Sequence, residues 1–416
     1  MPSNIDNQLV QPENLNDEAL LAANVLLFDA MVRHQVFLMR LNGSLRNETE
    51  KLLNATEEDI ANLILVRLHG VKGATPRNLA IVALLISDIR KLRHGAWTEV
   101  RTLWRSTLGE LTESEVRFLA TALETSLPVE YDAVPPVDKV STAAKALPFE
   151  GQTLAQWSNR IEEEDLRRIA QQIRIGLVQG EPARVIAARV IGTARMRGRN
   201  GVTQITRRRA DAIVRTAIIH FSNVARTAFL AANEEMFSEE MYVATLDSRT
   251  TPICRSLDGN TYPLGEGPMP PIHWNCRSLR VPRTTPDAVG SRPAKAVTEA
   301  MLVREYARKN GLKRAKHQKD IPVGHRVDYE RFARRRTREL TAIVPAKQTY
   351  GEWLARQSVE FQNDTLGISK ARLFRKGGLT LDKFVNRRGD ELTLAQLAQR
   401  EAVAFRAAGL DPGDYR

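Results

Sequence analysis

The chain has 416 residues, 43% of them hydrophobic and 26% charged, which is the composition of a soluble globular protein with two or three domains. Its net charge of +12 favours polyanionic partners, nucleic acid ahead of anionic membrane surfaces, although a basic surface also simply keeps a chain soluble. Two cysteines, no signal peptide and no apolar run long enough to cross a membrane argue against a secreted or membrane protein and favour a reducing cytoplasm.

Residues 1–126 are predicted to form an N-terminal helical docking domain. The low aromatic share of 6%, together with many Ala, Leu and Arg residues, favours helices over a large sheet. One helix is expected from Asn16 to about Leu53 with an interruption at Gly43, and another opens at Pro76. A capping box at Thr112 predicts a helix restart. This region carries no chemical motif.

The rest of the chain divides into four segments by composition. Residues 127–152 contain four prolines and are predicted to be a linker. Residues 153–285 begin with helices and end in a stretch, 242–282, that is rich in turn formers and holds both cysteines. Residues 286–345 are predicted to be a basic linker or arm, and residues 346–416 a C-terminal helical module. The predicted fold class is mainly α, with a small β/loop-rich Cys-His knuckle subdomain, α+β overall.

Two basic runs are candidate DNA-contacting segments. Residues 184–215 hold nine Arg and one acidic residue, and residues 304–338 hold thirteen Lys or Arg against four acidic residues with aromatic side chains interleaved. Such runs fit a phosphate backbone with occasional base stacking, whereas the alternative is a solvated helix face or arm. The residues predicted to contact DNA are Arg207, Arg208, Arg209, Lys313, Arg314, Lys316, Arg334, Arg335 and Arg336.

The stretch 242–282 carries a candidate metal site. Cys254 is followed by His273 and Cys276, and a His-x-x-Cys pair on a tight turn can place both side chains on one zinc ion. A closed structural zinc site needs four ligands, and Asp247 or water is the candidate for the fourth. Zinc is the only cofactor that the sequence suggests. A metal-free role, in which buried thiols pin the loop, stays open beside it.

Catalytic interpretations of this stretch are weaker. A zinc deaminase is excluded because the His-x-Glu and Pro-Cys-x-x-Cys motifs are absent. An HNH-type nuclease is suggested by His273, Asn275 and Cys276 but lacks a second His beside the first. A Cys–His nucleophilic pair lacks an obvious orienting Asn or Asp.

The pattern of this stretch resembles the Mu F-type head morphogenesis family of tailed phages, also called minor head or minor capsid proteins. The likeness covers about residues 155–285, is weaker around 348–400, and includes Arg215, Thr216 and Asn223 in the preceding helix. Thr251 departs from the family pattern, because many members have there the first Cys of a Cys-x-x-Cys. The matching residues are Asp247, Arg249, Thr250, Cys254, Leu257, Asp258, Gly259, Pro270, Pro271, His273, Cys276 and Arg277.

The resemblance implies a low-copy, non-enzymatic virion protein that acts in head morphogenesis and in packaging or delivery of DNA. Its implied partners are the portal protein, the major capsid protein and double-stranded DNA, with no membrane; self-association into a homo-oligomer is a further expectation. Its implied location is the capsid interior or the portal-proximal region, after assembly in the host cytoplasm. The alternatives are a metal-dependent, nuclease-like enzyme and a general DNA-binding protein.

Overall fold

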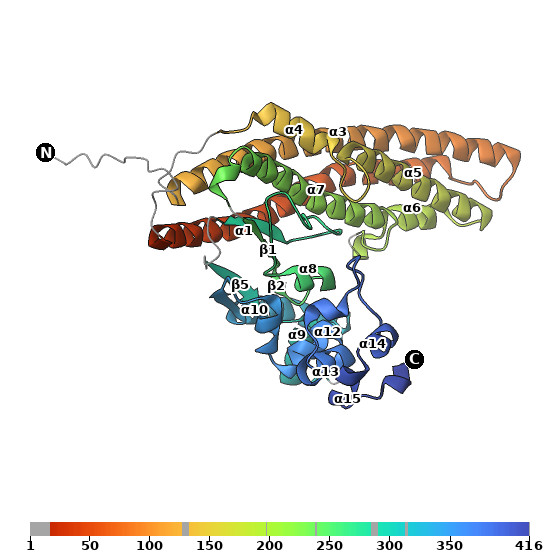
Figure 1. Cartoon of the computed structure of the whole chain (residues 1–416). Coiled ribbons are helices and arrows are strands. Elements are labelled where there is room, and N and C mark those ends of the chain that lie inside the picture. The colour runs from red at the N-terminus through yellow and green to blue at the C-terminus, as the bar shows by residue number, and fades with distance from the viewer. Residues whose placement is uncertain are drawn as a thin grey trace.

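The structure is a computed structural model that describes residues 17–126, 133–196, 198–237, 239–283, 290–312 and 315–415. Long helices form the upper layer in Figure 1, short helices form most of the lower body, and two small sheets lie where the two meet. Each sheet has three strands in the described part of the chain. The predicted fold class, mainly α with a small β-containing Cys/His part, is confirmed.

The helices of the upper layer bury apolar residues that recur at helical spacing. Two of them start where local signals predict. The helix that opens at Pro76 has proline in its first turn, and the helix after Thr153 begins with a capping box between Thr153 and Gln156. The helices of this layer are α1 (Asp17–Asn54), α2 (Glu57–Arg67), α3 (Pro76–Ser126), α4 (Val137–Ala146), α5 (Leu154–Val178), α6 (Ala183–Ile191) and α7 (Thr203–Ala231).

Two predicted helix breaks are wrong. α1 continues through Gly43, and α3 continues through Thr112. Thr112 is buried, and its hydroxyl donates to the carbonyl oxygen of Leu108 one turn earlier (2.9 Å) instead of capping a new helix. Tertiary packing of these long helices outweighs the local signals.

A buried ion pair joins four helices of the upper layer. Arg93 of α3 donates to Oδ2 of Asp165 of α5 through Nε (2.8 Å) and Nη2 (2.6 Å), and both side chains are 1% exposed. Arg93 also donates to the carbonyl oxygen of Leu53 in α1 (2.7 Å), while the hydroxyl of Thr206 in α7 donates to Asp165 Oδ1 (2.7 Å). Because both charges are hydrogen-bonded on several sides, the pair fixes how these four helices meet.

The hydrophobic cores extend across the predicted boundary at residue 126. One core brings together α1, α3, α7 and the first sheet, with buried residues that include Leu27, Val116, Phe229 and Val281. A second core joins α1, α3 and α7 to α5, with Trp97, Trp104, Ile161 and Phe221 among its residues. The division of the chain into separate units stays a prediction, but the segments on both sides of this boundary share their cores.

The predicted linker, 127–152, contains helix α4 within its described part. Val140 and Ala144 of α4 are buried, and the carbonyl oxygen of Ala144 accepts a hydrogen bond from His220 of α7 (3.1 Å). The prolines therefore flank a short packed helix, since Pro136 precedes α4 and Pro148 follows it. Residues 137–146 of the predicted linker are therefore helical, and the role of 127–152 as a linker stays a prediction.

The two sheets connect the upper layer to the lower body. In the first sheet, β1 (Glu239–Val243) lies between β3 (Thr261–Tyr262) and β4 (Leu279–Arg283), and both neighbours are antiparallel to it. In the second sheet, β5 (Ser291–Lys295) runs parallel to β2 (Leu246–Asp247) and antiparallel to β6 (Thr341–Pro345). The second sheet thus joins the Cys/His stretch to residues nearly 100 positions later.

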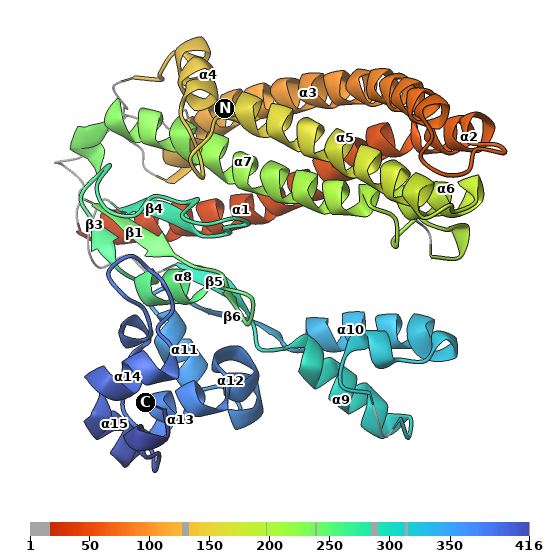
Figure 2. The ribbon, with the colours of Figure 1, turned by 90° about the vertical axis from the view of Figure 1, so that its right-hand side faces the viewer.

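The lower body has two further cores. α9 (Glu299–Lys309) and α10 (Arg326–Glu339) enclose a small core of their own around Tyr306, Tyr329 and Phe332, and they project sideways in Figure 2. The predicted basic arm is therefore a packed helix pair in its described part. The C-terminal core holds Tyr350, Trp353, Phe361 and Phe405.

The other helices are short. They are α8 (Pro252–Leu257), α11 (Tyr350–Ala355), α12 (Val359–Leu366), α13 (Ile368–Lys376), α14 (Leu394–Arg400) and α15 (Ala402–Ala407). Short 3-10 turns are η2 (Ala194–Met196), η3 (Glu234–Met236), η4 (Gln318–Asp320), η5 (Val323–His325), η6 (Leu381–Phe384) and η7 (Pro412–Tyr415).

One helical stretch of the described residues, Glu18–Arg67, is long and apolar enough to cross a membrane by length and composition. No such stretch was predicted from the sequence. Leu27, Met31 and Leu38 on this stretch are buried in the cores of the upper layer, which is how core helices of soluble proteins pass the same test.

Glu115 supplies a test of the packing between α1, α3 and α7. Its buried carboxylate accepts from Nε of Arg226 (3.0 Å) and contacts His34. Burial works to raise the pKa of Glu115, but Arg226 and His34 outweigh burial, so the pKa lies below the usual 4.5. We expect Glu115→Gln to lower the free energy of unfolding at neutral pH by about 3–5 kcal/mol, because the substitution leaves Arg226 buried without its charge partner.

The contribution of Glu115 to the free energy of unfolding depends on pH, and its direction follows from the lowered pKa. A carboxyl whose pKa is lowered by folding stabilises the protein above its unfolded pKa, and that contribution is lost as the pH falls through its folded pKa. Denaturant unfolding at several pH values should therefore show wild type and Glu115→Gln converging in acid. Glu99→Gln, at an exposed position of α3, is the control. If Glu115→Gln were as stable as Glu99→Gln at neutral pH, Glu115 would not stabilise the packing between α1, α3 and α7.

Candidate metal centre

Cys254, His273 and Cys276 meet at one point between the two layers. Sγ of Cys254 lies 3.1 Å from Nε2 of His273 and 4.0 Å from Sγ of Cys276, and the three ligand atoms all lie within 4.8 Å of one another. Tetrahedral zinc with ordinary bond lengths would separate two sulfurs by about 3.8 Å and a sulfur and a nitrogen by about 3.6 Å. The spacing therefore fits one zinc ion with little movement.

The three ligands come from two short segments. Cys254 lies in α8, which starts after Thr251 with Pro252 at its first position. His273 and Cys276 flank a tight turn in which the backbone N–H of Cys276 donates to the carbonyl oxygen of His273 (3.1 Å). Asn275 within this turn has a φ of 61°, a left-handed conformation that Asn adopts more readily than most residues.

Helix α7 holds the turn in place from the upper layer. The hydroxyl oxygen of Thr216 accepts from the backbone N–H of Asn275 (3.1 Å), and the side-chain amide of Asn223 donates to the carbonyl oxygen of Pro270. Both α7 residues are buried. The Pro270–Pro271 peptide bond, which precedes the turn, is cis.

Hydrogen bonding orients His273 as a metal needs. Its Nδ1 lies 2.8 Å from the carbonyl oxygen of Trp274 and donates to it, so Nε2 faces Cys254 and Thr251. A partner on the remote ring nitrogen is what fixes metal-binding histidines in other sites.

The electrostatics of the trio favour a thiolate. The hydrogen bond from Cys276 and then the contact with His273 lower the pKa of Cys254 against the effect of burial, while the same interaction with Cys254, together with burial, raises the pKa of Cys276. Burial opposes a charged imidazole, but Cys254 outweighs this and raises the pKa of His273. Tyr242 contacts Cys254 Sγ through its hydroxyl (3.2 Å), and burial and the cysteines raise the pKa of that hydroxyl. A metal cation bound here would replace protons on Cys254, His273 and Cys276.

Asp247 does not join the trio. Its two carboxylate oxygens accept from Nη1 (2.6 Å) and Nη2 (2.8 Å) of Arg277, and they also accept from Thr250 (3.1 Å) and from the backbone N–H of Arg249 (3.0 Å). Its backbone carbonyl accepts from Tyr350 (2.7 Å). The geometry therefore does not support Asp247 as the fourth ligand; the carboxylate organises the chain before α8 instead.

The fourth position is open among the described residues. The hydroxyl of Thr251 lies beside this position, 2.9 Å from Nε2 of His273. A hollow of about 170 Å³ adjoins Thr251, Cys254 and His273 and is bordered by Arg215 and Arg249. Three protein ligands beside a hollow leave room for water as the fourth ligand.

Asp258 fastens the Cys/His stretch to the lower body. Its fully buried carboxylate pairs with Arg292 of β5 through two hydrogen bonds of 2.7 Å. The carboxylate also accepts from the backbone N–H groups of Ala244 (2.7 Å) and Tyr350 (2.6 Å). Gly259 beside it has a φ of 87°, and a Cβ there would lie 2.8 Å from Thr349. Both conditions require glycine at this position.

The predicted motif residues thus form a frame around the trio. Thr250, Asp258, Gly259 and Arg277 make the contacts described above, and Pro271 follows the cis bond. The side chain of Arg249 is 72% exposed and lies 3.8 Å from Asp247.

Sequence reasoning missed three contributors: Tyr242, Trp274 and Arg292. The run of apolar residues around Tyr242 did not distinguish a hydroxyl aimed at a thiol from ordinary core packing. Arg292 was assigned to a linker, and no local pattern indicates that it pairs with Asp258 from 34 residues away. Trp274, between His273 and Asn275, was the one with a local signal, because a large apolar residue inside a tight turn must pack against something.

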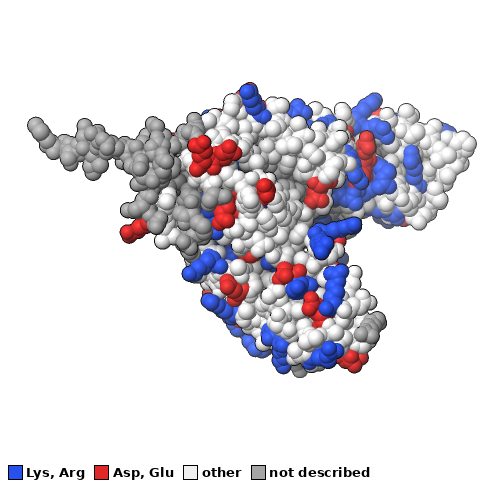
Figure 3. All heavy atoms as spheres, in the orientation of Figure 1, with Lys and Arg blue, Asp and Glu red and all other residues white. Residues whose placement is uncertain are grey.

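The predicted DNA-contacting residues differ in burial and in their ion pairs. Arg207 is buried and pairs with Glu57 and Asn54, so it is a structural residue. Arg209 contacts Glu164, Arg336 pairs with Glu305 and Glu339, and Lys313 and Arg314 lie outside the described residues. The exposed members are Arg208, Arg209, Lys316, Arg334 and Arg335. Lys and Arg are spread over both layers on the face in Figure 3, with acidic residues among them.

Comparison with known proteins adds one finding. No curated protein and no solved structure matches the chain significantly. Residues 150–280 match the family model described as Phage Mu protein F like protein. This range contains α5, α7, the trio and the motif residues, so the match confirms the resemblance that the sequence pattern predicted: residues 150–280 are similar to the Mu F-like family.

Proposed function

We propose that the protein is a minor head protein of a tailed phage or prophage, and that it acts without enzymatic activity in head morphogenesis and portal-proximal DNA packaging or delivery. The observation that carries this proposal is the Mu F-like match over residues 150–280. The net charge of +12 supports it, because a protein held beside packaged DNA benefits from a basic surface.

The outer end of the upper layer is the proposed contact with the portal or major capsid protein. Exposed apolar side chains on α2, α3 and α5 lie next in sequence to residues of the core that includes Ile64, Leu85 and Leu177. Exposed apolar groups of this kind mark protein contacts more often than isolated ones do. They are Leu65, Val66, Leu84 and Val178, between 41% and 74% exposed.

The exposed face of α10 is the proposed DNA contact. Tyr329 and Phe332 turn one face of this helix into the α9–α10 core. Arg331, Arg334, Arg335 and Arg338 recur at the spacing of a single helix face, and all four are exposed. Such a stripe can follow a phosphate backbone without reading sequence.

Replacing the four arginines of this stripe by Gln should weaken binding to a double-stranded DNA fragment at low salt. It should also make the plot of log affinity against log salt less steep, by about 0.9 for each phosphate that the variant no longer neutralises. Fluorescence anisotropy over a salt series measures both quantities. The control carries Gln at four exposed arginines of α3, namely Arg77, Arg90, Arg105 and Arg117.

Equal salt slopes for the two variants would show that α10 is not the contact. The head function itself is tested separately, by looking for the protein in purified heads of the phage that encodes it. Wild-type protein that is absent from both immature and mature heads would contradict the proposed function.

Zinc is the proposed occupant of the Cys254–His273–Cys276 cluster. The three ligand atoms, the tautomer of His273 and the open fourth position all support it. When bound, zinc would hold α8 and the turn together through two thiolates and an imidazole.

Protein purified without chelator should contain about one zinc per chain by elemental analysis. Cys254→Ser and Cys276→Ser should lose the metal and unfold at a lower temperature, because structural zinc stabilises the folded state directly. Asp247→Asn should keep the metal, since Arg277 occupies that carboxylate. Metal-free wild type, with both Ser variants as stable as wild type, would leave only the packing role.

A metal-dependent nuclease is the second candidate, and the hollow beside the open ligand position is the observation that favours it. The same preparations decide between the two. Under the proposed function, supercoiled plasmid stays intact with zinc or magnesium. Nicking by wild type that disappears in His273→Ala would support the nuclease instead.

A further inference from the structure

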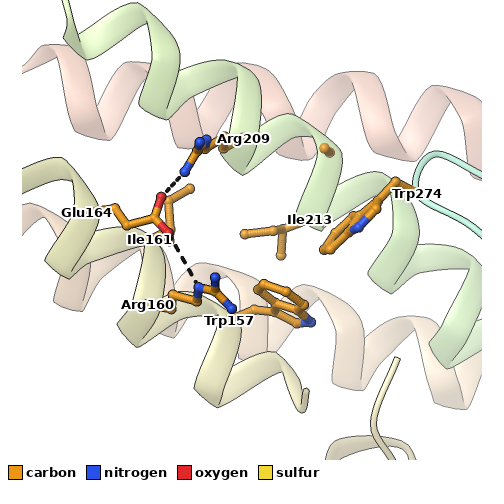
Figure 4. Close-up of a pocket in the computed structure, with 8 residues that line it drawn as sticks. Trp157, Arg160, Ile161, Glu164, Arg209, Ile213 and Trp274 are labelled. Atoms are coloured by element: carbon orange, nitrogen blue, oxygen red, sulfur yellow. Dashed lines mark hydrogen bonds and ion pairs between the residues drawn. The ribbon is translucent and has the colours of Figure 1, made fainter. Parts of the chain in front are cut away.

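A second hollow, of about 290 Å³, lies on the Mu F-like domain between α5 and α7 (Figure 4). Its walls are mostly apolar. Ile161 of α5, Ile213 of α7 and the two tryptophans Trp157 and Trp274 line it. Every described residue that lines it falls within residues 150–280, so the hollow belongs to this domain.

The tryptophans are held firmly. Their rings meet edge to face with centroids 4.9 Å apart, and the indole N–H of Trp157 donates to the carbonyl oxygen of Phe149 (3.0 Å). Trp274 belongs to the His273–Cys276 turn and lies next to a ligand of the trio. The candidate metal centre therefore positions one wall of this hollow.

The rim of the hollow carries surplus positive charge. Among the described residues, Glu164 is the only acid that lines it, and this carboxylate contacts Arg209, Arg160 (3.4 Å) and Arg168 (3.2 Å). Side chains of Arg160 and Arg209 are 55% and 53% exposed. Figure 4 shows these two arginines on either side of Glu164, at the mouth of the hollow. One carboxylate cannot neutralise three guanidinium groups, so a second carboxylate is favoured here.

We propose that this hollow is the docking site for an acidic segment of a partner protein. The segment places one aromatic or branched aliphatic side chain in the hollow, against the touching rings of Trp157 and Trp274. A neighbouring Asp or Glu pairs with Arg160 and Arg209. Tryptophan and arginine are the residues most enriched among the strongly contributing positions of protein interfaces. The proposal rests on the proposed head function only for the identity of the partner, which would be another head protein.

A nucleic-acid base fits the hollow less well. The two indoles lie edge to face, at 77°, and offer no pair of parallel faces between which a base stacks. The indole N–H of Trp157 already donates to the carbonyl oxygen of Phe149, and the isoleucine and alanine side chains inside the hollow offer no hydrogen bond to a base edge. The polar side chains that line the hollow, Arg160, Glu164 and Arg209, lie at its rim.

Three fluorescein-labelled peptides of equal length test the proposal by anisotropy. The first presents one Phe flanked by Glu, the second has Ala in place of Phe, and the third has Lys in place of Glu. We expect the first to bind at least tenfold more tightly than either of the others. A short oligothymidylate with the same label is the fourth probe.

Two variants test whether the peptide binds in this hollow. Arg160→Gln combined with Arg209→Gln should reduce affinity for the acidic Phe peptide at least tenfold. The control combines Arg167→Gln with Arg174→Gln at exposed positions of the same helix, α5, and should bind like wild type. Trp274→Ala should lose the preference for Phe over Ala. Because the arginines are on the surface, their double variant tests the site even where Trp274→Ala folds poorly.

Equal affinity for the three peptides would overturn the proposal, as would an Arg160→Gln/Arg209→Gln double variant that binds the acidic Phe peptide like the control. If wild type prefers the oligothymidylate and this double variant loses that preference, the hollow is assigned to nucleic acid instead. Failure of the head function would appear differently, as wild-type protein missing from heads, and would leave the order of peptide affinities unchanged.

Discussion

The structure depends on how the turn from His273 to Cys276 is held. Cys254 faces it from α8 in the lower body, while Thr216 and Asn223 bind it from α7 in the upper layer. The turn is therefore one place where the two layers share polar contacts, and Asp29 of α1, which accepts from the backbone N–H of Ser291 in β5 (2.8 Å), marks another. Its small size demands specific residue types, because a thiol, an imidazole and a left-handed Asn must coincide within four residues of chain. A bound cation would add to a geometry that hydrogen bonds already define.

Buried ion pairs also join separate parts of the chain elsewhere in the structure. Arg93 and Asp165 join the helices of the upper layer, and Asp258 and Arg292 join the Cys/His stretch to the second sheet. A buried pair with all hydrogen bonds made adds little net stability but penalises any packing that separates its members. Many of the arginines that make the chain basic thus specify how helices and sheets meet. The charge left for partners is concentrated on exposed faces, such as that of α10.

The residues that were predictable from sequence are those whose signal is local. Helix starts at Pro76 and Thr153, and the grouping of Cys254 with His273 and Cys276, follow from short-range rules. Contacts between distant segments were not predictable. Asp247 looked like a ligand by proximity in sequence, but Arg277 takes its carboxylate, and Arg207 looked like a DNA contact until Glu57 was found beside it. The continuity of α1 and α3 also depends on partners that no local window contains.

If the Cys/His cluster sets the position of Trp274, the cluster also shapes the docking hollow. Fluorine NMR of protein labelled with 5-fluorotryptophan tests this link directly, with the Trp274 signal assigned by its loss in Trp274→Phe. In Cys254→Ser we expect the Trp274 signal to shift or broaden, while the signal of Trp353, buried in the C-terminal core, keeps its position. A Trp274 signal that is unchanged by the loss of Cys254 would contradict the link between cluster and hollow.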